Sequence, residues 1–344
     1  MNDPFYRFTI ITFSLALIIS SNIAAQFTVR GNLESGVYKS TGDFLPKESD
    51  LLFAAEGKLG YKLNKENTEA FFELRTRPEW YGLTKELFSF KLRLNGELVR
   101  REKNFDWGVN ITRHLNRIAG GSVDIDYDIF AVQSNANFYW IENMPFSVAI
   151  GYAYQNIASS LPLNHDFIFL EGKLNAIFSP FFRAGYGLYI EKFFVEGETI
   201  VNDSKINETT TGYRTGPELE LNYLKDFVVN GQYRLLFLFS DESQFTTYEH
   251  WFRLVAGKIL FKKMSAFLLV DYFWRSIKNA ESPGEINVLY SPFNLENNIS
   301  FKIGYEPSDK FELYLKSSYF RNDLVYKDYT FEGWNFLIGM GISR

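Results

Sequence analysis

The sequence predicts an all-β protein, namely a transmembrane antiparallel up-and-down β-barrel of about sixteen strands. Apolar and polar side chains alternate along most of the chain from Phe27 onward, and an apolar segment opens the chain. Phenylalanine and tyrosine are abundant, at 35 and 21 of 344 residues. Alternation with a period of two places one set of side chains on each face of a β-strand. Many such strands rich in aromatic residues are typical of a barrel that contacts lipid.

Residues 1–25 have the features of a signal peptide. An apolar run from Phe8 to Ile19 is interrupted only by Thr and Ser and is followed by small residues up to Ala25. The run is shorter than the ~20 residues that a membrane-spanning helix needs, so a cleaved leader is favoured over an uncleaved anchor helix. Cleavage after Ala25 would leave residues 26–344 as a single barrel domain whose first strand begins at Phe27.

Composition excludes several classes of protein. The chain contains no cysteine, which excludes disulfides and thiolate metal sites. Its net charge of −5 argues against a role in binding nucleic acid. Its mean hydropathy of −0.17 is too low for an all-helical membrane protein. A barrel accommodates this value, because only alternate residues face the lipid.

Turn signals divide the chain into hairpins. Short turns are predicted at residues 64–67, 101–104, 143–145, 179–180, 225–226, 262–263 and 306–310. They alternate with longer connections at residues 40–49, 78–85, 115–121, 158–164, 197–207, 241–244, 279–291 and 324–328. Short turns on one side and longer loops on the other are the pattern of bacterial outer-membrane barrels. Together, the connections predict sixteen strands.

The strand count depends on residues 122–142. We interpret this segment as one long strand with a phase slip near residues 133–135, of the kind that a β-bulge produces. Dividing it into two strands would reverse the direction of everything that follows, so fourteen or eighteen strands remain as alternatives.

The chain resembles Gram-negative outer-membrane β-barrel proteins of the porin-like, Bacteroidota kind. The resemblance rests on the leader with its Ala25–Gln26 junction, on the alternating hairpins, and on an amphipathic last strand with one apolar face (Trp334, Phe336, Ile338, Met340 and Ile342). It covers essentially all of the chain after the leader. The resemblance implies export to the bacterial outer membrane and contact with its lipid.

If the apolar set faces lipid, the polar set faces a lumen. The charged candidates for the lumen wall are Arg75, Lys91, Arg93, Asp124, Asp126, Asp128, Arg183, Arg214, Glu218, Glu220, Arg234, Arg253, Asp271 and Arg275. One interpretation is a water-filled pore for passive diffusion of small hydrophilic solutes, with no cofactor. The other is a non-conducting barrel that serves as scaffold or subunit of a secretion, surface-assembly or gliding complex. In the second case envelope proteins would be its partners; a homo-oligomer is compatible with either.

The acidic residues and the histidines are two further candidates for a site. Asp124, Asp126 and Asp128 form an acidic ladder that could hold a cation such as Ca²⁺, although a solvated strand face is favoured and we predict no metal.

The chain has three histidines and no Gly-x-Ser-x-Gly motif, so no catalytic residues are predicted. His250 is expected on the outer face. The connection at residues 279–291 either folds inward as a constriction or remains a surface loop.

Overall fold

The structure is a computed structural model that describes residues 24–42, 49–82, 87–120, 123–141, 143–158, 163–201, 204–240, 246–278, 297–323 and 330–343. The predicted leader, apart from its last two residues, and the predicted connection at residues 279–291 lie outside these ranges. In the described part of the chain, no helix is long and apolar enough to cross a membrane.

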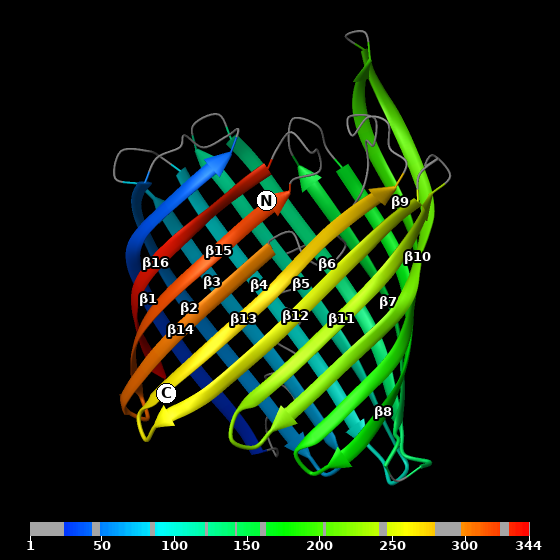
Figure 1. Cartoon of the computed structure of the whole chain (residues 1–344), viewed down its shortest axis with the longest axis vertical. Coiled ribbons are helices and arrows are strands. Elements are labelled where there is room, and N and C mark those ends of the chain that lie inside the picture. The colour runs from blue at the N-terminus through cyan, green and yellow to red at the C-terminus, as the bar shows by residue number, and fades with distance from the viewer. Residues whose placement is uncertain are drawn as a thin grey trace.

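Sixteen antiparallel strands close into an up-and-down barrel, in which each strand pairs with the next and β16 pairs with β1 (Figure 1). The strands are β1 (Ala24–Gly42), β2 (Ser49–Lys65), β3 (Thr68–Tyr81), β4 (Leu87–Arg101), β5 (Phe105–Gly120), β6 (Val123–Phe138), β7 (Phe146–Ala158), β8 (Leu163–Ser179), β9 (Phe182–Val201), β10 (Ser204–Leu224), β11 (Val228–Ser240), β12 (Thr246–Phe261), β13 (Met264–Lys278), β14 (Asn297–Ser308), β15 (Phe311–Asp323) and β16 (Thr330–Ser343). The predicted fold class and strand count are confirmed.

The seven predicted short turns all fall between consecutive strands, at one edge of the barrel. Some of the predicted longer connections are wrong because the strands extend through them. Residues 197–201 and 204–207 continue the β9–β10 ladder as far as the pair Val201 and Ser204, and these strand ends rise above their neighbours (Figure 1). Strand β3 likewise runs through Pro78, and β5 runs to Gly120.

Strand β6 passes through residues 133–135 without a bulge. Its register with β5 and with β7 is continuous, so Gln133 lies opposite both Asn110 and Gly151. The phase slip that the sequence suggested therefore does not exist. The apparent slip arises because apolar side chains lie on opposite faces in the two halves of this strand, as described below.

The outer face of the barrel is apolar. In β16, Trp334, Phe336 and Ile338 are exposed, whereas Leu337 on the inner face is buried. The same alternation exposes Leu188 and Ile190 on β9 around the buried Tyr189. Because a soluble protein rarely leaves so continuous an apolar surface in water, this band suits the hydrocarbon layer of a membrane.

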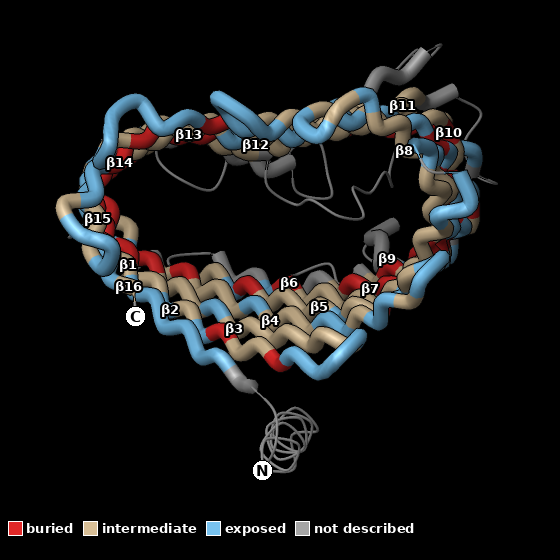
Figure 2. Tube along the Cα trace, turned by 90° about the horizontal axis from the view of Figure 1, so that it is seen from below, coloured by how far each residue is buried: buried red, intermediate tan, exposed pale blue. Residues whose placement is uncertain are grey.

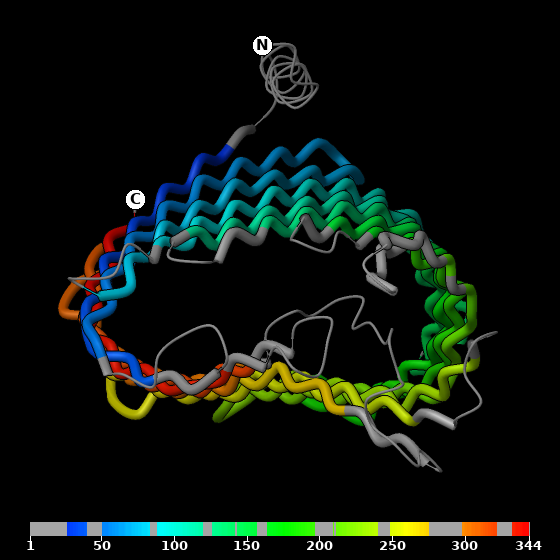
Figure 3. Tube along the Cα trace, turned by 90° about the horizontal axis from the view of Figure 1, so that it is seen from above, coloured from blue at the N-terminus to red at the C-terminus, as the bar shows by residue number. Residues whose placement is uncertain are grey.

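The barrel is oval in cross-section (Figure 2, Figure 3). Strands β3, β4 and β5 belong to one broad wall, and β12 and β13 belong to the wall that faces it (Figure 2). The walls turn at two ends, one near β15 and β1 and the other near β8 and β10 (Figure 2). The two broad walls therefore face each other across the short axis of the oval (Figure 2, Figure 3).

Candidate functional site

The strand register decides which face each predicted lumen residue occupies, because directly paired residues share a face. Arg75 lies opposite Arg93, and Arg234 lies opposite both Glu218 and Trp251. The residues that alternation and pairing place on the inner face are Arg75, Lys91, Arg93, Arg183, Arg214, Glu218, Glu220, Arg234, Arg253, Asp271 and, from its backbone register, Arg275.

The acidic ladder lies on the outer face instead. Asp128 pairs with Leu115 and Asp126 pairs with Arg117, and the backbone register places Asp124 on the same side. The physical reason is Tyr127, whose side chain is only 4 % exposed and packs in an apolar cluster on the inner face. Alternation then directs Asp126 and Asp128 outward. There Arg113 binds Asp128 with an Nη2–Oδ2 distance of 2.7 Å.

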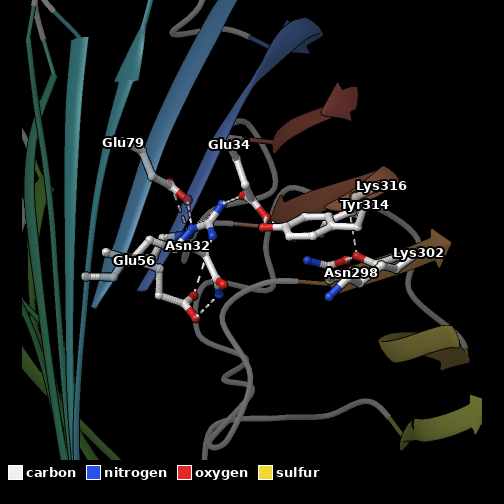
Figure 4. A network of polar contacts seen from close by, with 12 residues as sticks. Asn32, Glu34, Glu56, Glu79, Asn298, Lys302, Tyr314 and Lys316 are labelled. Carbon is white, nitrogen blue, oxygen red and sulfur yellow. Dashed lines mark hydrogen bonds and ion pairs between the residues drawn. The ribbon is translucent and has the colours of Figure 1, made fainter. Parts of the chain in front are cut away.

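One network of polar side chains occupies the end of the oval near β15 and β1 (Figure 4). Arg77 on β3 binds Glu34 on β1 (Nη2–Oε2, 2.5 Å) and Glu79 on its own strand (Nε–Oε1, 2.6 Å). Tyr314 on β15 donates its hydroxyl to Glu34 at 2.8 Å. We call Glu34, Arg77, Glu79 and Tyr314 the Arg77 cluster; it joins strands on both sides of the β1–β16 junction.

A second network lies at the opposite end and is fully buried. Arg214 on β10 is within ion-pair distance of Glu191 on β9 (Nη1–Oε1, 3.0 Å) and of Glu249 on β12 (Nε–Oε2, 2.9 Å). All three side chains are 0 % exposed. Tyr189 adds a hydrogen bond from its hydroxyl to Glu191 at 2.7 Å. We call Arg214, Glu191 and Glu249 the Arg214 cluster.

A third network adjoins it. Arg234 on β11 forms ion pairs with Glu171 on β8 and with Glu218 on β10, the latter at 2.7 Å. Lys173 on β8 lies 2.6 Å from Glu171 and 3.0 Å from Glu218. These four residues form the Arg234 cluster, in which each carboxylate has two cationic partners.

Aromatic side chains pack against these two networks. The guanidinium of Arg214 lies 5.3 Å from the ring centroid of Phe193, and that of Arg234 lies 4.5 Å from the ring of Tyr189. Phe193 and Tyr189 belong to the same inner apolar cluster as Tyr127. The end of the oval near β8 and β10 is thus filled by paired charges and packed rings, as a protein core is.

The middle of the broad walls is different, because charged side chains there remain exposed although they lie on the inner face. Arg75 and Arg253 expose 44 % and 42 % of their side chains, and Arg93 is also exposed. Inner-face side chains of a closed barrel stay exposed only where the interior has space for water. This central strip, which we define as Arg75, Arg93, Arg253 and Asp271, is the candidate channel wall.

The three histidines lie on three different strands, β5, β8 and β12. His250 stacks on Trp274 on the outer face with ring centroids 4.7 Å apart, and its Nδ1 lies 2.8 Å from the Tyr233 hydroxyl. His165 is buried between Phe167 and Phe193. His114 pairs with Ile129, on the face opposite to Asp128. Within the described ranges no group of three or more His, Cys, Asp or Glu residues is arranged to hold a metal ion.

Several residues of these networks were absent from the predicted set, notably Glu34, Glu171, Lys173, Arg77 and Glu79. Arg77 and Glu79 share the parity of Arg75 along β3, so alternation alone would have included them. The assumption that a loop begins at Pro78 concealed this signal.

The fold and the site define a class: a closed sixteen-stranded barrel with an apolar outer face and a polar interior.

No family model matches the chain, and no curated protein matches it. Among solved structures, OprB of Pseudomonas putida matches with a TM-score of 0.48 and 11 % identity, covering 93 % of this chain and 94 % of that one. A loop L8 deletion mutant of OmpT, an outer membrane protein of Vibrio cholerae, matches with a TM-score of 0.46 and 10 % identity over 93 % of this chain and 100 % of that one. These similarities describe the general barrel architecture alone.

Proposed function

We propose that this protein is an outer-membrane channel through which small hydrophilic solutes diffuse passively. In this proposal residues 1–25 are a signal peptide that is cleaved on export, and residues 26–344 form the barrel. The apolar outer face supports residence in a membrane, because closed barrels are the only β-structures whose backbone groups are all satisfied in lipid. The proposal requires no chemistry and no cofactor.

The observation that carries the proposal is the unequal exposure of the inner face. Side chains of the Arg214 cluster are 0 % exposed, whereas those of the central strip are exposed. Sixteen strands enclose enough space for an aqueous channel. Paired charges fill the two ends of the oval, and the path for solutes runs between the broad walls.

In this proposal, the passage of a solute through the channel depends on the size and the charge of that solute. A hydrated solute that passes the central strip meets guanidinium and carboxylate groups that replace part of its hydration shell. Because these groups are fixed on opposite walls, they favour or hinder a solute according to its charge without binding it tightly.

Planar-bilayer recording of the purified protein tests the proposal. We expect discrete, ohmic conductance steps, and no steps from the same preparation after heat unfolding of the barrel. A folded barrel that inserts without conducting would overturn the proposal. Absence of conductance together with stoichiometric co-purification of envelope proteins would favour the alternative role as scaffold or subunit of a surface complex.

A further inference from the structure

We propose that Arg93 and Arg253, assisted by Arg75, form a constriction that admits anions in preference to cations and interacts with solutes carrying an oxyanion group. This inference rests on the proposed function and specifies its substrate class. The sequence did not distinguish these residues from the other charged residues of the inner face.

The position of these residues in the ring is the first observation. Strands β4 and β12, which carry Arg93 and Arg253, lie half-way round the closed barrel from each other. The oval shape brings the two walls together along the short axis (Figure 2). The charges of Arg75, of Glu73 and, from the opposite wall, of Arg253 all act on Arg93, so guanidinium groups from opposite walls lie within electrostatic range across the lumen.

The position of these residues along the barrel axis is the second observation. Arg75, Arg93 and Arg253 each lie near the middle of their strands, β3 (Thr68–Tyr81), β4 (Leu87–Arg101) and β12 (Thr246–Phe261). Antiparallel strands of similar length in one barrel share a midplane. The three side chains therefore form one layer, which every solute must pass on its way through.

The third observation is that Arg93, unlike Arg75 and Arg253, has no carboxylate partner among the described residues: Arg75 pairs with Glu56 (Nη2–Oε2, 2.5 Å) and Arg253 pairs with Asp271. Arg93 donates its Nε–H to Asn95 at 3.2 Å and forms no ion pair with any carboxylate that the structure describes. Arg75 lies directly opposite Arg93 in the ladder, and like charges at such positions destabilise a sheet. Glu56 compensates Arg75 but not Arg93, so the Arg93 guanidinium is the group of this layer that an anion in the lumen would neutralise, and such a departure from full pairing is expected mainly at functional sites.

Arg253 is held in place by its neighbours. Its guanidinium lies 4.9 Å from the ring centroid of Trp251, and Arg234 lies 4.7 Å from that ring. Asp271 receives hydrogen bonds from both Arg253 Nη2 (3.2 Å) and Trp251 Nε1 (3.0 Å). The Arg253 side chain is still 42 % exposed. A pre-positioned but accessible guanidinium can bind a passing anion with little loss of conformational entropy.

The chemistry of guanidinium selects the class of anion. Its planar fork of N–H donors matches the paired oxygens of a carboxylate or a phosphate. A cation in the same layer meets repulsion from both walls, which acts as a barrier. Carboxylates and phosphates thus share the feature that this layer recognises.

Reversal potentials in a KCl gradient test the anion preference. We expect the native protein to pass chloride in preference to potassium. Arg93→Gln and Arg253→Gln should each lower the anion-to-cation permeability ratio about threefold to fivefold, as expected when a unit charge about 10 Å from the path is removed in water. The matched control is Arg113→Gln, which removes an arginine from the outer face and should leave the ratio unchanged.

Inorganic phosphate and acetate, added separately to the chloride bath, test the oxyanion preference. We expect both to reduce chloride current in the native protein and to do so less in Arg93→Gln. If only phosphate or only acetate reduces the chloride current, the site recognises the phosphate group or the carboxylate group, respectively. Heat-modifiable mobility on gels must first establish that each variant forms a barrel.

The outcomes separate this inference from the proposed function. Conductance without anion preference, or with a preference that Arg93→Gln leaves intact, overturns the inference and leaves the channel standing. Anion preference without any effect of phosphate or acetate overturns the oxyanion part. A folded barrel that inserts without conducting overturns both the proposed function and this inference.

Discussion

Arg234 on β11 and Glu171 on β8 form an ion pair that passes over two intervening strands, β9 and β10. Such a contact is possible only where the wall curves sharply, so that side chains of non-adjacent strands meet. Lys173 and Glu218 complete the contact from β8 and β10. The pairing stabilises the tight curvature at this end of the oval and so helps to set the separation of the broad walls.

Removing the cation of the Arg214 cluster should weaken the barrel strongly. Arg214→Gln leaves Glu191 and Glu249 buried without their guanidinium, and breaking a buried ion pair in this way costs about 3–5 kcal/mol. The temperature at which the folded form converts to the unfolded form on gels should fall by clearly more than in Arg117→Gln. Arg117 and Asp126 are 59 % and 52 % exposed and 3.6 Å apart, and a pair of this kind contributes less than about 1 kcal/mol. Equal effects of the two variants would contradict the assignment of Arg214 to a closed interior.

Closure of the barrel should be sensitive to one glycine of β1. A Cβ added at Gly36 would meet the backbone oxygen of Phe336 on β16 at 1.9 Å, whereas one at Gly31 would meet nothing nearer than the Glu56 oxygen at 3.9 Å. We expect Gly36→Ala to lower the yield of folded, heat-modifiable barrel and Gly31→Ala to leave it unchanged. The comparison is made on refolding into detergent. Full assembly of Gly36→Ala would show that the β1–β16 junction has more room than the structure gives it.

The acidic ladder should have no influence on ion preference. Asp126 and Asp128 lie on the outer face, so Asp126→Asn and Asp128→Asn should leave the reversal potential in a KCl gradient at the native value. Arg93→Gln, measured in the same way, serves as the positive comparison. A shift towards anions in either aspartate variant would place the ladder in the lumen, as the sequence alone suggested.

Alternation and turn chemistry were sufficient to predict the fold, the strand count and the face of most charged residues. They failed at β6 because the rule of apolar side chains outward reverses where Tyr127 and its neighbours form an inner apolar cluster. They also could not predict the oval cross-section. This shape depends on contacts such as Arg77 with Glu34 and Arg234 with Glu171, which join strands distant in the ring or the sequence. No local pattern indicates which charges are buried in pairs and which stay exposed.

Chemical modification of a single thiol at position 93 tests most directly whether a water-filled path passes the central strip. The chain contains no cysteine, so Arg93→Cys introduces one reactive group, and Leu94→Cys, on the outer face of the same strand, is the matched control. During conductance recording, a negatively charged methanethiosulfonate reagent should lower the current and the anion preference of Arg93→Cys in steps, and should leave Leu94→Cys unaffected. Complete labelling of Arg93→Cys with no change in current, or no labelling at all in the folded barrel, would contradict an aqueous channel at this position.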